Sequence, residues 1–146
     1  MNDAHLHLLI NHFPIIGLIV GTIVLIIGVL LKSATTRKAG LFAILLCTIF
    51  AIPSFSTGEG AEEVVEHMPN MSEETHHLIH EHEEKAEFFM PFAWTLMILA
   101  AISLFFEWKK NKFTTYLTII TLVFSLIAIY LVKEVGTSGG EISHPE

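Results

Sequence analysis

The sequence predicts an all-α integral membrane protein, a four-helix bundle with a helical extension on its outer side. Of the 146 residues, 52% are hydrophobic and only 16% are charged. Soluble domains average about 25% charged residues. The apolar residues gather in four runs of roughly 17–24 residues, each long enough to cross the hydrocarbon core as a helix. We therefore expect a single four-span membrane domain over residues 1–146.

The four spans are expected at about 8–31, 38–56, 88–108 and 113–133. The first run lacks the basic start of a signal peptide and is too long for one. Gly17, Gly21 and Gly28 share one face of this span, where small residues allow helices to approach closely. We favour packing inside the bundle for this face, and a homodimer interface is the alternative.

Residues 57–87, between the second and third spans, predict the helical extension. Thr57 can cap a helix that runs from about Glu59 to Met68 and ends at Pro69. Ser72 can cap a second helix, which has no breaker before Pro91 and continues into the third span. The glycines of 136–140 favour a tight backbone turn over the bundle after the fourth span, and a loose tail is the alternative.

The basic residues set the expected orientation. Six of the eight Lys and Arg lie in the two short loops that follow the first and third spans. The positive-inside rule assigns these loops to the cytoplasm. Both termini and the extension then face the outer, periplasmic side of a bacterial inner membrane. The net charge of −7 has the wrong sign for nucleic-acid binding. The lone Cys47 excludes an internal disulfide.

All nine histidines fall on the outer side, together with every acidic residue except Glu107. His12 lies inside the first span, where an ionisable group indicates function. His82 falls on the apolar face of its helix and is expected either to bond a core carboxylate or to bind a cofactor. His76, His77 and His80 fall on the solvated side.

An acidic stripe precedes these histidines. Glu59, Glu62, Glu63 and Glu66 share one helix face, with His67 four residues after Glu63. The stripe is either a solvated face or a set of oxygen ligands. Imidazole and carboxylate together suit Fe, Zn or Mn. The predicted metal ligands are His12, Glu59, Glu63, Glu66, His67, His82, Glu83, Glu141 and His144.

Four pieces of the chain occur in the order found in a known family. They are His-Phe-Pro at 12–14, Thr-Gly-Glu to Glu-His at 57–67, His-Glu at 82–83 and Gly-Gly-Glu at 139–141. The chain resembles this family of small four-span bacterial membrane proteins, a domain of unknown function. The resemblance implies four helices with a shared outer-face site, and it adds weight to the predicted ligands. Related sequences carry histidines where this chain has Glu134 and Thr137, which weakens a haem-ligand role for the last piece.

These observations leave three functions open. The first is a membrane metalloprotein with one or two ions, acting as an oxidoreductase if the metal is redox-active. The second is a b-type cytochrome in which His12 and His82 ligate haem b and electrons pass between a quinone and a redox partner. The third is a non-catalytic metal-binding accessory subunit. A transporter ranks last, because no charge lies near the middle of the bilayer.

Overall fold

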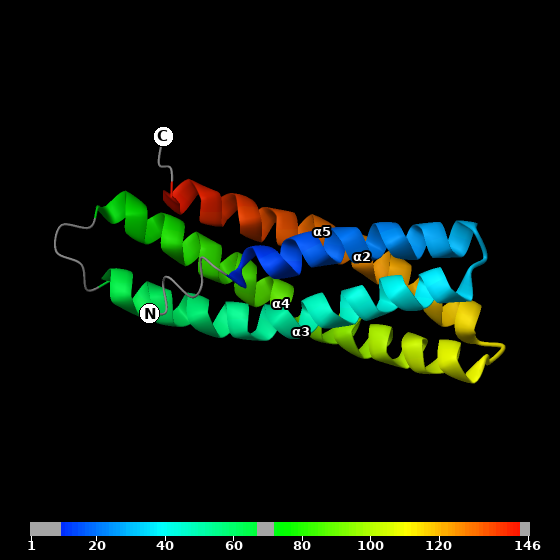
Figure 1. The fold of residues 1–146 in the computed structure, drawn as a ribbon. Helices are drawn as coiled ribbons and strands as arrows, with labels where there is room; N and C mark the ends of the chain where they lie inside the picture. The colour runs from blue at the N-terminus through cyan, green and yellow to red at the C-terminus, as the bar shows by residue number, and fades with distance from the viewer. Residues whose placement is uncertain (1–9, 67–71, 144–146) are drawn as a thin grey trace.

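The structure is a computed structural model that describes residues 10–66 and 72–143, with the side chains of 59, 61–66 and 143 left outside the description. The described chain forms four helices: α2 (His12–Leu30), α3 (Ala34–Glu66), α4 (Glu73–Lys109) and α5 (Thr114–Ser143). Consecutive helices run antiparallel, and α5 returns to contact α2 (Figure 1). The all-α four-helix bundle expected from the sequence is confirmed.

The bundle has the distribution of apolar and polar side chains that is typical of a membrane protein. All four helices are long and apolar enough to cross a membrane. The surface carries large apolar side chains such as Leu30 and Tyr116, which are 74% and 69% exposed. The interior instead buries hydroxyl groups, and Ser103 bonds Thr121 across α4 and α5 at 2.8 Å. Because lipid is as apolar as the core, such side chains can face outward while small polar residues join the helices. The chain is therefore a multi-pass integral membrane protein.

The extension exists, but α3 enters it without the predicted break. Thr57 lies inside the helix, and its hydroxyl donates to the carbonyl oxygens of Pro53 at 2.9 Å and Ser54 at 3.0 Å. The prediction that Thr57 caps a new helix is therefore wrong. A threonine hydroxyl can bond the preceding turn as readily as it caps a helix start, and the residues that follow it sustain the helix.

The start of α4 agrees with the prediction. Ser72 adopts an extended backbone conformation, and its Oγ accepts a hydrogen bond from the backbone N–H of Thr75 at 3.1 Å. Glu73 and Glu74 occupy the first turn, where their charges complement the helix dipole. The helix then continues through Pro91 into the membrane span, as expected.

The predicted turn at the glycines of 136–140 is wrong. The helix α5 continues through them to Ser143, and no glycine of the described chain has a positive φ. Packing explains this difference, because Ser138 is buried against α4 and Gly139 lies beneath a side chain of that helix. Tertiary contacts here override the low helix propensity of glycine.

The glycine face of α2 packs against α3, which confirms the internal-packing interpretation. A Cβ atom on Gly28 would lie 2.6 Å from the backbone nitrogen of Arg37. On Gly21 it would lie 3.0 Å from the nitrogen of Ile44. Only glycine permits this approach of the two backbones.

The two ends of the bundle differ in charge. We call the end with the turns at 31–33 and 110–113 the basic end. There Arg37 of α3 forms a two-pronged ion pair with Glu107 of α4, which is 3% exposed. We call the opposite end, with the start of α4 and the close of α5, the acidic end. The start of α2 stops short of the outermost turns of α3 and α4 (Figure 1).

Candidate metal-binding site at the acidic end

The imidazole of His82 is held between α4 and α5. Its Nδ1 atom lies 3.0 Å from the Oγ of Ser138, whose side chain is 2% exposed. The same Oγ donates to the backbone carbonyls of Glu134 at 3.1 Å and Val135 at 3.0 Å. A hydroxyl has one hydrogen, and these two carbonyl oxygens of α5 accept it. With that hydrogen on the α5 carbonyls, the Oγ atom accepts from Nδ1–H, and a neutral ring in that tautomer carries its lone pair on Nε2.

Gly139 completes the seat of this ring. A Cβ atom at Gly139 would lie 3.1 Å from Cε1 of His82 and 3.5 Å from Nδ1. The ring therefore rests on the backbone of α5, and a larger residue would have to displace it. A hydrogen bond to one ring nitrogen that fixes tautomer and orientation is typical of metal-ligating histidines.

The other described histidines are more open to the surroundings. His12 is the first residue of α2, and its side chain is exposed. His76 and His77 are exposed, as the sequence predicted. His80 is exposed too, with Nδ1 3.5 Å from Glu83 and Nε2 3.6 Å from Glu84. Because these two carboxylates approach opposite nitrogens of the His80 ring, they do not converge on one point beside it.

Lys85 is a cation within the acidic end. Its Nζ lies 2.7 Å from Oε1 of Glu81, one turn earlier on α4. This hydrogen bond raises the pKa of Lys85, and the charges of Glu81, Glu141 and Glu134 act in the same direction, against desolvation. The same pairing lowers the pKa of Glu81. The charge density of 73–87 places both groups outside the membrane-spanning part of α4. Glu141, a predicted metal ligand, therefore has an ammonium group as an alternative counter-ion.

The remaining predicted ligands lie outside the described side chains. Glu59, Glu63 and Glu66 lie on the last turns of α3, with side chains outside the described set. His67 and His144 lie outside the described residues. Over the side chains that are described, no three His, Cys, Asp or Glu residues gather around a common point for a metal ion. His82 is the predicted nitrogen ligand that the described structure holds in a fixed orientation.

Sequence reasoning missed the contacts that Ser138 and Gly139 make with His82, and it missed Lys85. The first two lie in a glycine-rich piece that resembles a turn, and only the helical course of α5 brings them to His82. Lys85 carried a usable signal, because it follows Glu81 by four residues on a predicted helix. Asn11 was also passed over: its Oδ1 is buried and has no hydrogen-bond partner within the described structure.

Comparison with known proteins agrees with this architecture. Residues 4–145 match the family model described as "Predicted membrane protein (DUF2231)". No curated protein and no solved structure matches the chain. The match covers nearly the whole chain and confirms the resemblance drawn from the sequence pieces.

Proposed function

The chain belongs to the DUF2231 family of predicted membrane proteins, and we propose that it binds a transition metal at the acidic end of its bundle, with His82 as a nitrogen ligand. The observation that carries this proposal is the seat of the His82 ring on Ser138 and Gly139. A ring fixed through Nδ1–H directs the Nε2 lone pair in one orientation, which is what a metal ligand requires.

The surroundings of His82 favour a borderline metal with mixed nitrogen and oxygen ligands. Carboxylates are dense on the first turns of α4, and the acidic stripe of α3 adds Glu59, Glu63 and Glu66 at the same end of the bundle. Imidazole with carboxylate suits Fe, Zn or Mn, bound as one ion or two. Iron would add redox or electron-transfer chemistry, and zinc would add a structural or Lewis-acid role. In a haem b centre the second axial ligand would be His12, whose exposure favours the non-haem form.

The metal content of purified protein tests the proposal. We expect untagged, detergent-purified protein to carry stoichiometric Fe, Zn or Mn by plasma mass spectrometry. His82→Gln should lose most of this metal, because each loss of about 1.4 kcal/mol of binding free energy weakens the affinity tenfold and a missing ligand removes several such steps. His76→Gln is the matched control, because His76 is exposed on the same helix.

Two results would contradict the proposal: wild-type protein without stoichiometric metal, or full metal retention by His82→Gln. Stoichiometric iron with a haem absorption band would assign the metal to haem b. Lowering the pH from 7 to 5 should release a non-haem metal, because protons compete with the metal for imidazole nitrogen. Retention of all metal at pH 5 would exclude imidazole ligation.

We further propose that the acidic end faces the periplasm of a bacterial cell and that the basic end faces the cytoplasm. The concentration of Lys and Arg in the two turns of the basic end supports this orientation. The metal site would then take its ion, and any redox partner or quinone, from the outer side of the membrane.

A further inference from the structure

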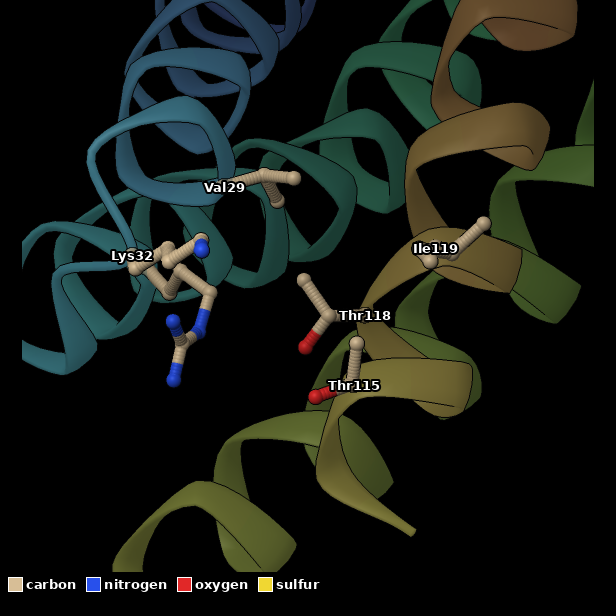
Figure 2. A pocket seen from close by; sticks show the side chains of 6 residues that line it. Val29, Lys32, Thr115, Thr118 and Ile119 are labelled. Carbon is tan, nitrogen blue, oxygen red and sulfur yellow. The ribbon is translucent and has the colours of Figure 1, made fainter.

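A pocket of about 350 Å³ opens at the basic end of the bundle, whereas His82 lies near the start of α4 at the acidic end. It lies between α2, α3 and α5 (Figure 2). Its lining residues are Val29, Lys32, Arg37, Thr115, Thr118 and Ile119. Every polar side chain in this lining can donate a hydrogen bond, and none is acidic.

Thr118 gives the first indication of a ligand. Its side chain is 1% exposed, and its Oγ1 has no hydrogen-bond partner within the part of the chain that is described. Five threonines elsewhere in these helices donate to the carbonyl four residues earlier, namely Thr48, Thr57, Thr95, Thr121 and Thr137. Thr22 of α2 is buried and unpartnered within the described residues, like Thr118, but it does not line the pocket. Figure 2 shows the hydroxyls of Thr118 and Thr115 turned toward the side of the pocket on which Lys32 lies. A buried hydroxyl without a partner is unfavourable unless a ligand supplies one.

The charge of the pocket gives the second indication. Arg37 directs Nε and one terminal nitrogen, the latter at 3.3 Å, toward Glu107. A guanidinium has five N–H donors, so three remain for another acceptor. Glu107 offsets the charge of Arg37, and Lys32 therefore supplies the net positive charge of the lining.

The backbone of Lys32 has the conformation of a residue that follows a helix end. Its φ of 52° lies in the left-handed region, where glycine is the favoured residue. Lys110 ends α4 in the same conformation, with φ of 50°, but does not line the pocket. It is a matched control for Lys32.

We propose that this pocket binds a phosphate group. Two hydroxyl donors, one ammonium and a partly engaged guanidinium match the oxygens of a phosphate, which accept charge-assisted hydrogen bonds. The phosphate belongs either to an anionic phospholipid in the leaflet at the basic end or to free inorganic phosphate. Val29 and Ile119 border the site with apolar surface that suits the glycerol and acyl part of a lipid.

The test uses delipidated full-length protein in dodecyl maltoside. Its thermal midpoint is followed while dioleoylphosphatidylglycerol or inorganic phosphate is added, and the apparent Kd is read from the saturation of the rise. We expect Lys32→Gln to weaken binding about tenfold or more, because it removes a charged donor. Thr118→Val should weaken binding about fivefold without lowering the midpoint of the unliganded protein, since it removes only the unpartnered hydroxyl.

Two controls isolate the pocket from general effects of charge and packing. Lys110→Gln removes a lysine of the same conformation at the same end. Thr22→Val removes another hydroxyl that is 1% exposed and has no partner in the described structure, but that lies outside the pocket. Both should keep the wild-type Kd within about twofold.

Each outcome decides the proposal. A saturable rise with phosphatidylglycerol alone identifies a lipid headgroup, and a rise with inorganic phosphate identifies free phosphate. A rise with neither probe would overturn the phosphate site. So would an unchanged Kd in both Lys32→Gln and Thr118→Val, because the phosphate would then bind elsewhere.

Discussion

Each end of the bundle contains one cationic or ionisable side chain whose partner lies on another helix. At the acidic end Ser138 fixes His82, and at the basic end Glu107 fixes Arg37. Glu107 was visible in the sequence as the one acidic residue among basic loops, whereas Ser138 carried no such signal inside its glycine-rich piece. The contacts of Ser138 with His82 and of Glu107 with Arg37 depend on how the helices are aligned against one another. A single sequence does not reveal this alignment.

Loss of one partner of the Arg37–Glu107 ion pair should destabilise the protein, whereas replacement of both partners by apolar residues should destabilise it little. Glu107→Leu should lower the free energy of unfolding by about 3 kcal/mol, because it leaves a poorly exposed guanidinium without its counter-charge. The double variant Arg37→Met with Glu107→Leu should recover most of that loss. Unfolding by added SDS in dodecyl maltoside measures both. Equal stability of the wild type and the single variant would show that the pair contributes nothing.

Helix α2 is joined to α3 by backbone approach rather than by large side chains. Gly17, Gly21 and Gly28 lie on its face toward α3. From α3, Gly40 lies against the backbone of α2 at Leu25. The sequence predicted close packing for this face, since small residues at helical spacing have few other uses in a membrane. It did not identify the partner helix, because any apolar neighbour could have filled the same groove.

This packing predicts opposite effects for two glycine substitutions. Gly28→Ala should destabilise the protein by about 1–3 kcal/mol, because its Cβ would lie 2.6 Å from a backbone nitrogen of α3. Gly140→Ala should be neutral or stabilise by up to about 1 kcal/mol, since it meets no atom within 4 Å and favours the helix. Thermal midpoints in one detergent compare the two. Similar destabilisation by both would contradict the close approach.

The whole molecule separates its charges along the membrane normal. Lysine and arginine gather at the turns of the basic end, whereas histidine and glutamate gather at the acidic end. This separation gives the bundle two different candidate sites, one suited to a cation and one to an anion. The middle of the bundle between them is apolar apart from buried hydroxyl groups and the thiol of Cys47.

Cysteine labelling in cells tests the orientation of the molecule. The native Cys47 is buried, so its background reactivity should be low. Ser72→Cys, at the exposed start of α4, should react with a membrane-impermeant maleimide in intact cells. Lys110→Cys, at the opposite end of α4, should react only after the membrane is permeabilised. The reverse pattern would place the acidic end in the cytoplasm and contradict the proposed orientation.

The sequence alone determined the class of the protein, its four spans and the polarity of its two ends. These features depend on composition and on residues near one another in the chain. Each helix that crosses the bilayer must by itself be long and apolar enough and must satisfy its own backbone hydrogen bonds. Tertiary structure decided that α3 passes Thr57 without a break, that α5 stays helical through its glycines, and that Ser138 and Gly139 seat His82. It also placed the unpartnered hydroxyl of Thr118 beside the pocket that contains Lys32 and Arg37. These outcomes depend on which helix faces are pressed together, and packing between helices outweighs the local preferences that a sequence reveals.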